Sequence, residues 1–179
     1  MIRRMLIAAA IVVFGVWVPA SAENWYVGAS FLDTSAEFDS AGGTFDPSSD
    51  GWKLMVGYDI NKYCGIEGTY YDMGDMEDTN SVGTLDANIE AFDVSFRGML
   101  PVGKLFRFTG KLGFSSIDIE TQTTGTLLSV DVDGTSWEFM YGIGAEVDLG
   151  KRFAIRADWE AWDVEGSLDA VSIGGYFRF

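Results

Sequence analysis

The sequence predicts an all-β protein, an eight-stranded antiparallel up-and-down transmembrane β-barrel of a bacterial outer membrane. Three observations predict it. Eight segments alternate between apolar and polar residues with the period of a β-strand. The chain begins with a stretch typical of a secretory signal. The connections between the segments are alternately short and long, as in barrels with short periplasmic turns and longer external loops.

The N-terminal stretch has the three parts of a signal peptide. Arg3 and Arg4 form a basic start, an apolar run extends from Met5 to Val18, and Ala20-Ser21-Ala22 offers a cleavage site. The apolar run is too short for a membrane-spanning helix. We therefore expect residues 1–22 to be a signal peptide and residues 23–179 to form one barrel domain, with no second domain after it.

The period-two pattern gives approximate bounds for eight strands. They are Trp25–Asp33, Gly51–Ile60, Cys64–Gly74, Asn88–Leu100, Lys104–Asp118, Ser136–Leu149, Phe153–Asp163 and Leu168–Phe179. The predicted tight turns are Asn61–Tyr63, Pro101–Gly103 and Gly150–Arg152, and the predicted long loops are 34–50, 75–87 and 119–135. Eight strands close into a barrel whose interior side chains just fill, and closure leaves no strand edge inside the lipid.

Each strand has one face without charge and one polar face. In the segment Ser136–Leu149, Trp137, Tyr141 and Ile143 alternate with Glu138 and Glu146. Other members of the charge-free face are Trp52, Leu54, Val56, Phe92, Val94, Phe96, Phe106, Phe108, Phe114, Phe153, Ile155 and Trp159. The polar faces carry Lys53, Asp59, Glu67, Asp93, Arg97, Arg107, Lys111, Arg156, Asp158 and Glu160.

A soluble β-sandwich alternates in the same way, so alternation alone does not separate it from a barrel. Aromatic residues gather near the strand ends, where the girdles of a membrane barrel lie. The polar faces combine glycine with charges of both signs, which suits a narrow lumen filled by interacting side chains. These features, together with the turn lengths, favour the barrel.

Composition excludes several classes of function. The net charge is −15, and it becomes −17 when the segment with Arg3 and Arg4 is removed, so nucleic-acid binding is excluded. With 47% hydrophobic and 15% aromatic residues, the chain is not a disordered acidic protein. The sequence has no His, which rules out His-based catalysis and argues against the lipid-modifying and aspartyl-protease barrels that need it. We expect no enzyme activity, no cofactor and no metal site.

Several smaller features have two interpretations. Asp158 and Glu160 form a carboxylate pair, but Arg and Lys share their face, so a structural network is favoured over catalysis. One predicted loop is rich in carboxylates, with Asp72, Asp75, Glu77 and Asp78 close together. They could form a calcium site or a solvated acidic rim. The rim is favoured because their spacing matches no calcium-binding loop. The lone Cys64 is expected to be an apolar wall residue.

The sequence resembles a known family at several short segments, which are spread over nearly the whole predicted barrel. The segments Trp25–Ala29, Gly57–Asn61, Ile66–Gly68, Arg156–Trp159 and Tyr176–Phe179 resemble the transmembrane domain of outer membrane protein A. The chain departs from that family in its acidic outer loops and in lacking a segment for the periplasmic domain, so a receptor role is not carried over.

The resemblance implies roles for particular residues. Glu67 with Arg156, and Arg97 with Glu146, resemble the family's charged pairs that cross the lumen and block free passage. Parity alone places these four side chains on the inward face, where they either brace the interior or form a switchable gate; bracing is favoured. Phe177 and Phe179 resemble the C-terminal signal read by the outer-membrane insertion machinery, and they are also expected to be lipid-facing wall.

The sequence therefore predicts an integral protein of the cell outer membrane of a Gram-negative bacterium, most simply a monomer with a structural role in the envelope. Its expected partners are outer-membrane lipid and lipopolysaccharide, and the insertion machinery during assembly. Two alternatives stay open: a narrow ion or small-solute pore gated by lumenal salt bridges, and adhesion or partner binding through the acidic outer loops. A lipid-modifying enzyme is the least favoured reading.

Overall fold

The structure is a computed structural model, and it describes residues 24–40, 43–45, 48–80, 83–124, 129–164 and 167–179. The predicted signal peptide, residues 1–22, lies outside them. Within the described part, no helix is long and apolar enough to span a membrane. The strands are β1 (Trp25–Ser40), β2 (Gly43–Phe45), β3 (Ser48–Asn61), β4 (Cys64–Asn80), β5 (Gly83–Val102), β6 (Phe106–Thr124), β7 (Ser129–Asp148), β8 (Phe153–Trp162) and β9 (Ser167–Arg178).

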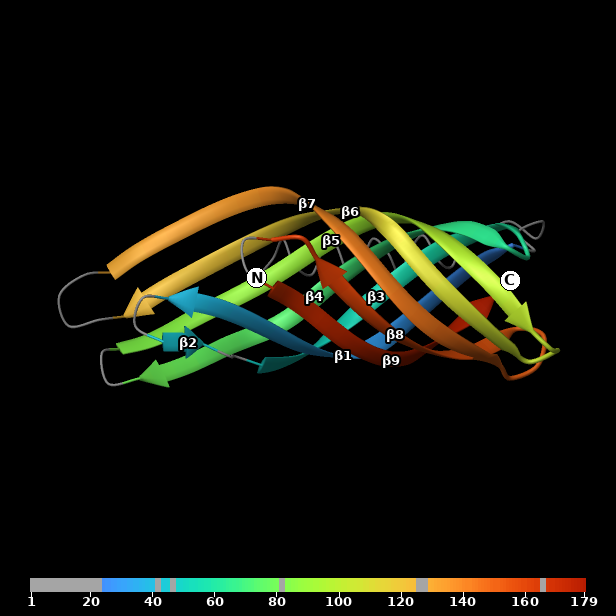
Figure 1. The fold of residues 1–179 in the computed structure, drawn as a ribbon, viewed down its shortest axis with the longest axis horizontal. Helices are drawn as coiled ribbons and strands as arrows, with labels where there is room; N and C mark the ends of the chain where they lie inside the picture. Colours follow the sequence, from blue (N-terminus) through green and yellow to red (C-terminus); the bar gives the residue numbers. More distant parts are fainter. Residues whose placement is uncertain (1–23, 41–42, 46–47, 81–82, 125–128, 165–166) are drawn as a thin grey trace.

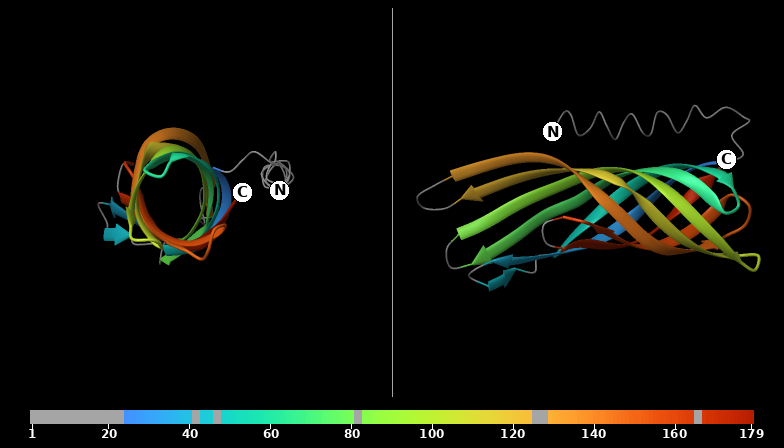
Figure 2. Two further views of the ribbon diagram at one scale, coloured as in Figure 1. Left: turned by 90° about the vertical axis from the view of Figure 1, so that its right-hand side faces the viewer. Right: turned by 45° about the horizontal axis from the view of Figure 1, so that its top comes forward.

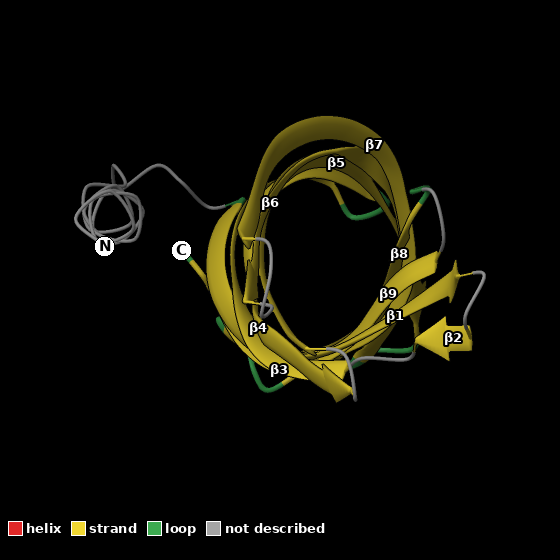
Figure 3. Ribbon diagram, turned by 90° about the vertical axis from the view of Figure 1, so that its left-hand side faces the viewer, coloured by secondary structure: helices red, strands yellow, loops and turns green. Residues whose placement is uncertain are grey.

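Eight of these strands form a closed barrel. From β3 to β9 each strand pairs antiparallel with the next, β1 pairs with β3, and β9 returns to pair with β1 from Tyr26 to Glu37. Figure 3 shows the closed ring along the barrel axis, and Figure 1 shows the tilt of the strands. The short β2 stands apart from the wall and pairs only with the end of β1, at Phe38–Ser40. The predicted eight-stranded antiparallel barrel is confirmed.

The two faces of the wall separate as the alternation predicts. Outward side chains such as Val94 (59% exposed) and Ile143 (66% exposed) are left open, whereas Ser95 and Glu146, which lie on the inward face, are buried. A closed wall with an apolar exterior is what lipid requires, because the ladders pair the backbone groups that would otherwise face lipid. Aromatic pairs also form on the exterior, among them Trp25 with Tyr58 and Trp52 with Tyr70.

The strands extend further than the sequence predicts. The ranges 34–50, 75–87 and 119–135 were expected to be loops, but β1, β4, β5, β6 and β7 continue into them as antiparallel ladders. The expectation was wrong because acidic, Ser, Thr and Gly content was taken as a loop signal, although Ile, Val and Thr at alternate positions support a ladder. At the opposite end, Pro101 and Val102 belong to β5, and β6 starts at Phe106 rather than Lys104.

Tight turns mark one end of the barrel. In the turn between β3 and β4, the side-chain oxygen of Asn61 accepts hydrogen bonds from the backbone N–H groups of Tyr63 (2.8 Å) and Cys64 (3.1 Å). The Asn61 amide also donates to the Cys64 sulfur (3.1 Å), so this thiol belongs to the turn. Gly150, between β7 and β8, has a φ of 101°, a conformation that glycine adopts without strain. Short turns identify this end as the periplasmic one.

The opposite end is uneven. The β4–β7 side of the wall extends well beyond the β8–β9 hairpin, as Figures 1 and 2 show. β6 and β7 pair as far as Thr124 and Ser129, whereas β8 ends at Trp162 and β9 begins at Ser167. We call the part of β4–β7 above the level of Trp162, residues 75–80, 83–90, 118–124 and 129–138, the outer sheet.

Candidate functional site: the charged lumen

Glu67 of β4 is the centre of the charge network inside the barrel. Its two carboxylate oxygens accept hydrogen bonds from Arg156, Oε2 at 2.6 Å from Nη1 and Oε1 at 2.9 Å from Nη2. Lys111 Nζ lies 2.8 Å from Oε1, and the Tyr26 hydroxyl donates to Oε2. All four side chains are buried. The first predicted pair is therefore in contact across the lumen, with a two-pronged geometry that fixes its orientation.

The second predicted pair is also in contact. Arg97 Nη1 donates to Glu146 Oε1 at 2.7 Å, and its Nη2 donates to Asp59 near the periplasmic end. Glu146 has three further neighbours, the Tyr176 hydroxyl at 2.8 Å, Arg107 Nε at 3.1 Å and Arg178 Nη2 at 4.0 Å. Arg97 Nη1 also lies 4.0 Å from Glu67 Oε2. The two pairs thus belong to one continuous network rather than to two separate locks.

A third group of charges extends the network toward the outer end. Lys53 Nζ contacts Asp158 Oδ2 at 3.0 Å and Glu160 Oε2 at 2.6 Å, and Lys111 contacts Glu160 as well as Glu67. Arg156 Nε donates to Asp158 at 2.6 Å, which joins this group to Glu67. The sequence placed these side chains on the inward faces but did not select Lys53 and Lys111 as members of the site. The signal was present in the inward position of each lysine beside strands that carry inward carboxylates.

Asp93 differs from the other buried carboxylates. The Tyr71 hydroxyl donates to its Oδ2 at 2.7 Å, while its Oδ1 has no hydrogen-bond partner. Among the described residues no Lys or Arg forms an ion pair with Asp93. Its hydrogen-bond partner is therefore a hydroxyl group and not a cation.

Small residues make room for the network. A Cβ atom built on Gly57 would lie 2.1 Å from the Tyr26 ring, so a larger residue at this position would displace Tyr26 from Glu67. The Tyr26 ring in turn lies against Arg97, whose guanidinium carbon is 4.6 Å from the ring centroid. Glycine on the inward face therefore provides space that an aromatic side chain occupies.

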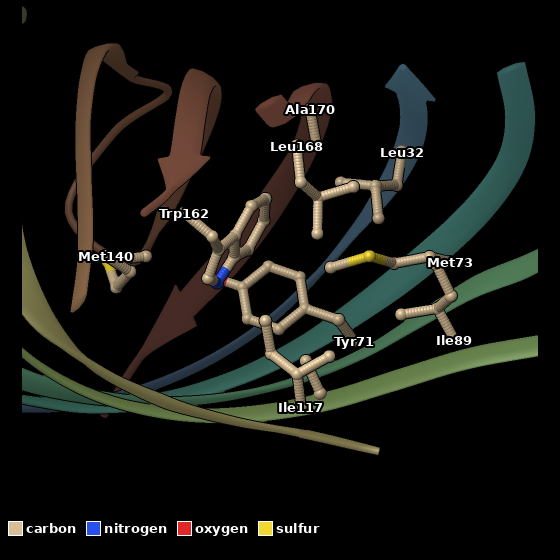
Figure 4. Packing of buried hydrophobic residues seen from close by; sticks show 10 residues of the cluster. Leu32, Tyr71, Met73, Ile89, Ile117, Met140, Trp162, Leu168 and Ala170 are labelled. Carbon is tan, nitrogen blue, oxygen red and sulfur yellow. The ribbon is translucent and has the colours of Figure 1, made fainter. Parts of the chain in front are cut away.

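An apolar layer covers the network on its outer side. Figure 4 shows Trp162 and Tyr71 at the centre of this layer, with side chains from several strands around them. The two rings meet edge to face with centroids 5.3 Å apart. The layer consists of the buried residues Leu32, Tyr71, Met73, Ile89, Ala91, Ile117, Met140, Trp162, Leu168 and Ala170. This layer was not predicted from the sequence, because the inward faces were expected to be polar throughout.

The carboxylates of the network lie next to cations. Ionised groups that face one another in a closed lumen need partners, and here Glu67, Glu146, Asp158 and Glu160 each contact at least one cation. In the described part of the chain, no group of three or more Cys, Asp or Glu residues is placed to hold a metal ion. The side chains of Asp75, Glu77 and Asp78, from the suggested acidic rim, lie outside the described residues.

The C-terminal aromatics lie on the exterior at the periplasmic end. The Phe177 ring packs against Phe153 (centroids 5.0 Å apart) and Phe179 (5.3 Å). The backbone N–H of Phe179 donates to Trp25 O at 3.0 Å, which continues the closing seam between β9 and β1. This placement fits a wall position for both residues, and their role as an assembly signal stays a prediction.

Comparison with known families decides the identity of the fold. Residues 6–177 match the family described as "Outer membrane protein beta-barrel domain". The chain belongs to this family. Together with the eight-stranded architecture, this makes it an outer membrane protein A-like barrel of the outer membrane. No curated protein sequence matches it.

Solved structures of family-like barrels support the same fold. Neisserial surface protein A has a TM-score of 0.64 at 15% identity, with 87% of this chain and 97% of that chain covered. Ail of Yersinia pestis has a TM-score of 0.60 at 15% sequence identity, with 88% of this chain and 99% of that chain covered. The N-terminal β-barrel domain of OprF from Pseudomonas aeruginosa has a TM-score of 0.60 at 13% sequence identity, with 88% of this chain and 98% of that chain covered. At such identities the likeness concerns the fold.

Proposed function

We propose that this outer membrane β-barrel protein has a structural role in the envelope of a Gram-negative bacterium: a closed barrel that anchors an acidic outer sheet at the cell surface. The observation that carries the proposal is the burial of two groups of side chains inside the lumen. Ion pairs around Glu67 fill the lower part, and the apolar layer around Trp162 fills the outer part. Proposed partners are outer-membrane lipid and lipopolysaccharide around the wall, and the insertion machinery through Phe177 and Phe179, for a protein that acts as a monomer and not as an enzyme.

The same observation weighs against the pore alternative. A gate of salt bridges opens a path only when the rest of the lumen is polar and wide enough for water. Here Met73, Ile117 and Met140 are almost fully buried above the charges, so rearranging Arg156 or Arg97 leaves an apolar closure in place. Gly57 on the inner face does not widen the lumen, since the Tyr26 ring occupies the space beside it.

Partner binding is the second candidate, and the outer sheet favours it. Residues 75–90 and 118–138 contain ten acidic residues and no Lys or Arg. One Ail structure holds the heparin analogue sucrose octasulfate, a highly anionic ligand. An acidic sheet repels such a ligand, so a partner of this chain should be cationic instead.

The envelope role is tested in cells that lack the protein. We expect such cells to become more sensitive to detergent and to hydrophobic antibiotics. The double variant Glu67→Gln/Arg156→Met should restore resistance in proportion to the amount of folded protein in the outer membrane. The reason is that the proposed role needs a folded barrel and not a gate. Unchanged resistance in the deletion strain would contradict the proposal, and the matched control is a strain that carries the wild-type protein on the same vector.

A further inference from the structure

The outer half of β7 is paired on one side only. β6 pairs with β7 along its full length, to Ser129. On the other side, β8 pairs with β7 only from Met140 to Asp148, and the last hydrogen bond runs from Asp163 N to Phe139 O at 2.9 Å. Figure 1 and the right-hand view of Figure 2 show β7 running on beyond this point toward the outer end. Among the described residues, the stretch Ser129–Glu138 therefore has a free edge.

The register defines which backbone groups this edge presents. Phe139 O faces β8, and in an antiparallel ladder the backbone groups of alternate residues face the same side. The N–H and C=O groups of Trp137, Thr135 and Asp133 thus point away from β6. These groups lie beyond the end of β8 at Trp162, and no described residue of the β8–β9 connection is hydrogen-bonded to them.

This edge lacks the usual protection against pairing. Native proteins blunt exposed edges with Lys, Pro, bulges or a covering segment. The stretch 129–139 contains neither Lys nor Pro, and the β6–β7 register has no shift along it. The rim of β1 offers a contrast, because β2 covers its end at Phe38–Ser40. Among the residues that the structure describes, the edge of β7 is therefore a regular strand edge with open hydrogen-bonding capacity.

Charge selects the occupant. The sequence from 112 to 150 has no Lys or Arg, and β7 itself contains Asp131, Asp133 and Glu138. A second copy of this chain would place the same acidic strand against itself, and like charges on paired strands are unfavourable. An extended segment rich in Lys or Arg gains electrostatic attraction as well as the backbone hydrogen bonds.

We propose that the free edge of β7, from Ser129 to Glu138, binds an extended basic segment of another protein by strand addition. The backbone of alternate β7 residues supplies the hydrogen bonds, and the acidic outer sheet supplies the preference for a basic partner. The proposal goes beyond the envelope role and does not depend on whether the barrel conducts ions.

The test uses the whole barrel in lipid nanodiscs and a ten-residue acetylated, amidated peptide of alternating Lys and Val. A control peptide of equal charge has Pro in place of each Val, so that it cannot form a strand. We expect saturable binding of the Lys/Val peptide, slower amide hydrogen exchange at Trp137 and Thr135, and much weaker binding of the control. Equal binding of both peptides, or no binding of either, would overturn the proposal.

Two substitutions at one position localise the interaction. Thr135→Pro removes an edge-facing N–H while the bonds to β6 remain, and should weaken peptide binding about tenfold. Thr135→Ala keeps that N–H and should bind as the wild type does. Equal affinities of the two variants would place the peptide elsewhere and refute the assignment. If Thr135→Pro does not fold, the exchange measurement on wild-type protein decides alone: unprotected Trp137 and Thr135 amides in the bound state refute the proposal.

Discussion

Removal of the Glu67 charge should destabilise the barrel strongly. In Glu67→Gln, the central carboxylate that contacts Arg156 through two hydrogen bonds and Lys111 at 2.8 Å becomes neutral. Lys111 retains Glu160 and Arg156 retains Asp158, but each loses its shared anion. Breaking a buried ion pair from one side costs about 3–5 kcal/mol. We expect a loss of stability in this range, measured by urea unfolding in lipid vesicles with tryptophan fluorescence.

A double-mutant cycle separates the pair from its surroundings. Glu67→Gln, Arg156→Met and the double variant should show a coupling near the upper part of the usual range of about 0.5–3 kcal/mol for contacting groups. The cycle of Arg97→Met with Glu146→Gln should give a smaller coupling. Its single hydrogen bond at 2.7 Å is supplemented by Arg107 on Glu146 and by Asp59 on Arg97, so each partner keeps a neighbour. Zero coupling in both cycles, or a larger one for Arg97 and Glu146, would refute this reasoning.

Three further predictions follow from the faces and ends of the barrel. Val94→Arg and Ile143→Arg place a charge on the exposed exterior, and each should lower the free energy of unfolding by roughly 2–4 kcal/mol near the bilayer midplane. Ser95→Ala in the lumen should lower it less. Unchanged unfolding curves for both Arg variants would mean that the faces are misassigned. Asp93→Asn should leave stability unchanged or raise it, in contrast to Glu67→Gln, because no described Lys or Arg forms an ion pair with Asp93 and its Oδ1 has no hydrogen-bond partner. A loss as large as that of Glu67→Gln would contradict this explanation. Deletion of Phe179 should lower the protein level in isolated outer membranes more than it lowers the refolding yield in vitro, since the lost burial of one ring costs only about 1.5–3 kcal/mol. Normal levels in the outer membrane would contradict a role of Phe179 in targeting.

Period-two alternation was sufficient for the fold because the wall follows it along most of each strand, with register shifts at Asp59/Asn61 and Asp72/Asp75. Phe92, Val94 and Phe96 face outward and Asp93, Ser95 and Arg97 face inward, as parity requires. Both charged pairs were also found from position, through the resemblance. Contact between particular side chains depends on the stagger of strands that are distant in sequence, which parity does not encode. For this reason Lys111 was assigned to the inner face but its position between Glu67 and Glu160 was not foreseen.

The outer end was predicted least well. Residues 119–135 have the composition of a loop, yet the β6–β7 ladder continues through Ile119 and Gly134 to Thr124 and Ser129. A polar composition indicates exposure to solvent, whereas the length of a strand depends on whether a neighbouring strand is present to pair with it. The apolar layer was missed for a related reason. Met73, Ile117 and Met140 occupy inward positions among polar ones, and only the closed ring brings them together.

Single-channel recording in planar bilayers tests directly whether the lumen is closed. We expect no stable ionic current through the purified wild-type barrel, and no current through Arg156→Ala either, because the apolar layer around Trp162 still fills the lumen. A current should appear only when that layer is also reduced, for example in Arg156→Ala combined with Trp162→Ala and Met140→Ala. Stable openings in the wild type, or in Arg156→Ala alone, would contradict a doubly closed barrel and favour a pore gated by salt bridges.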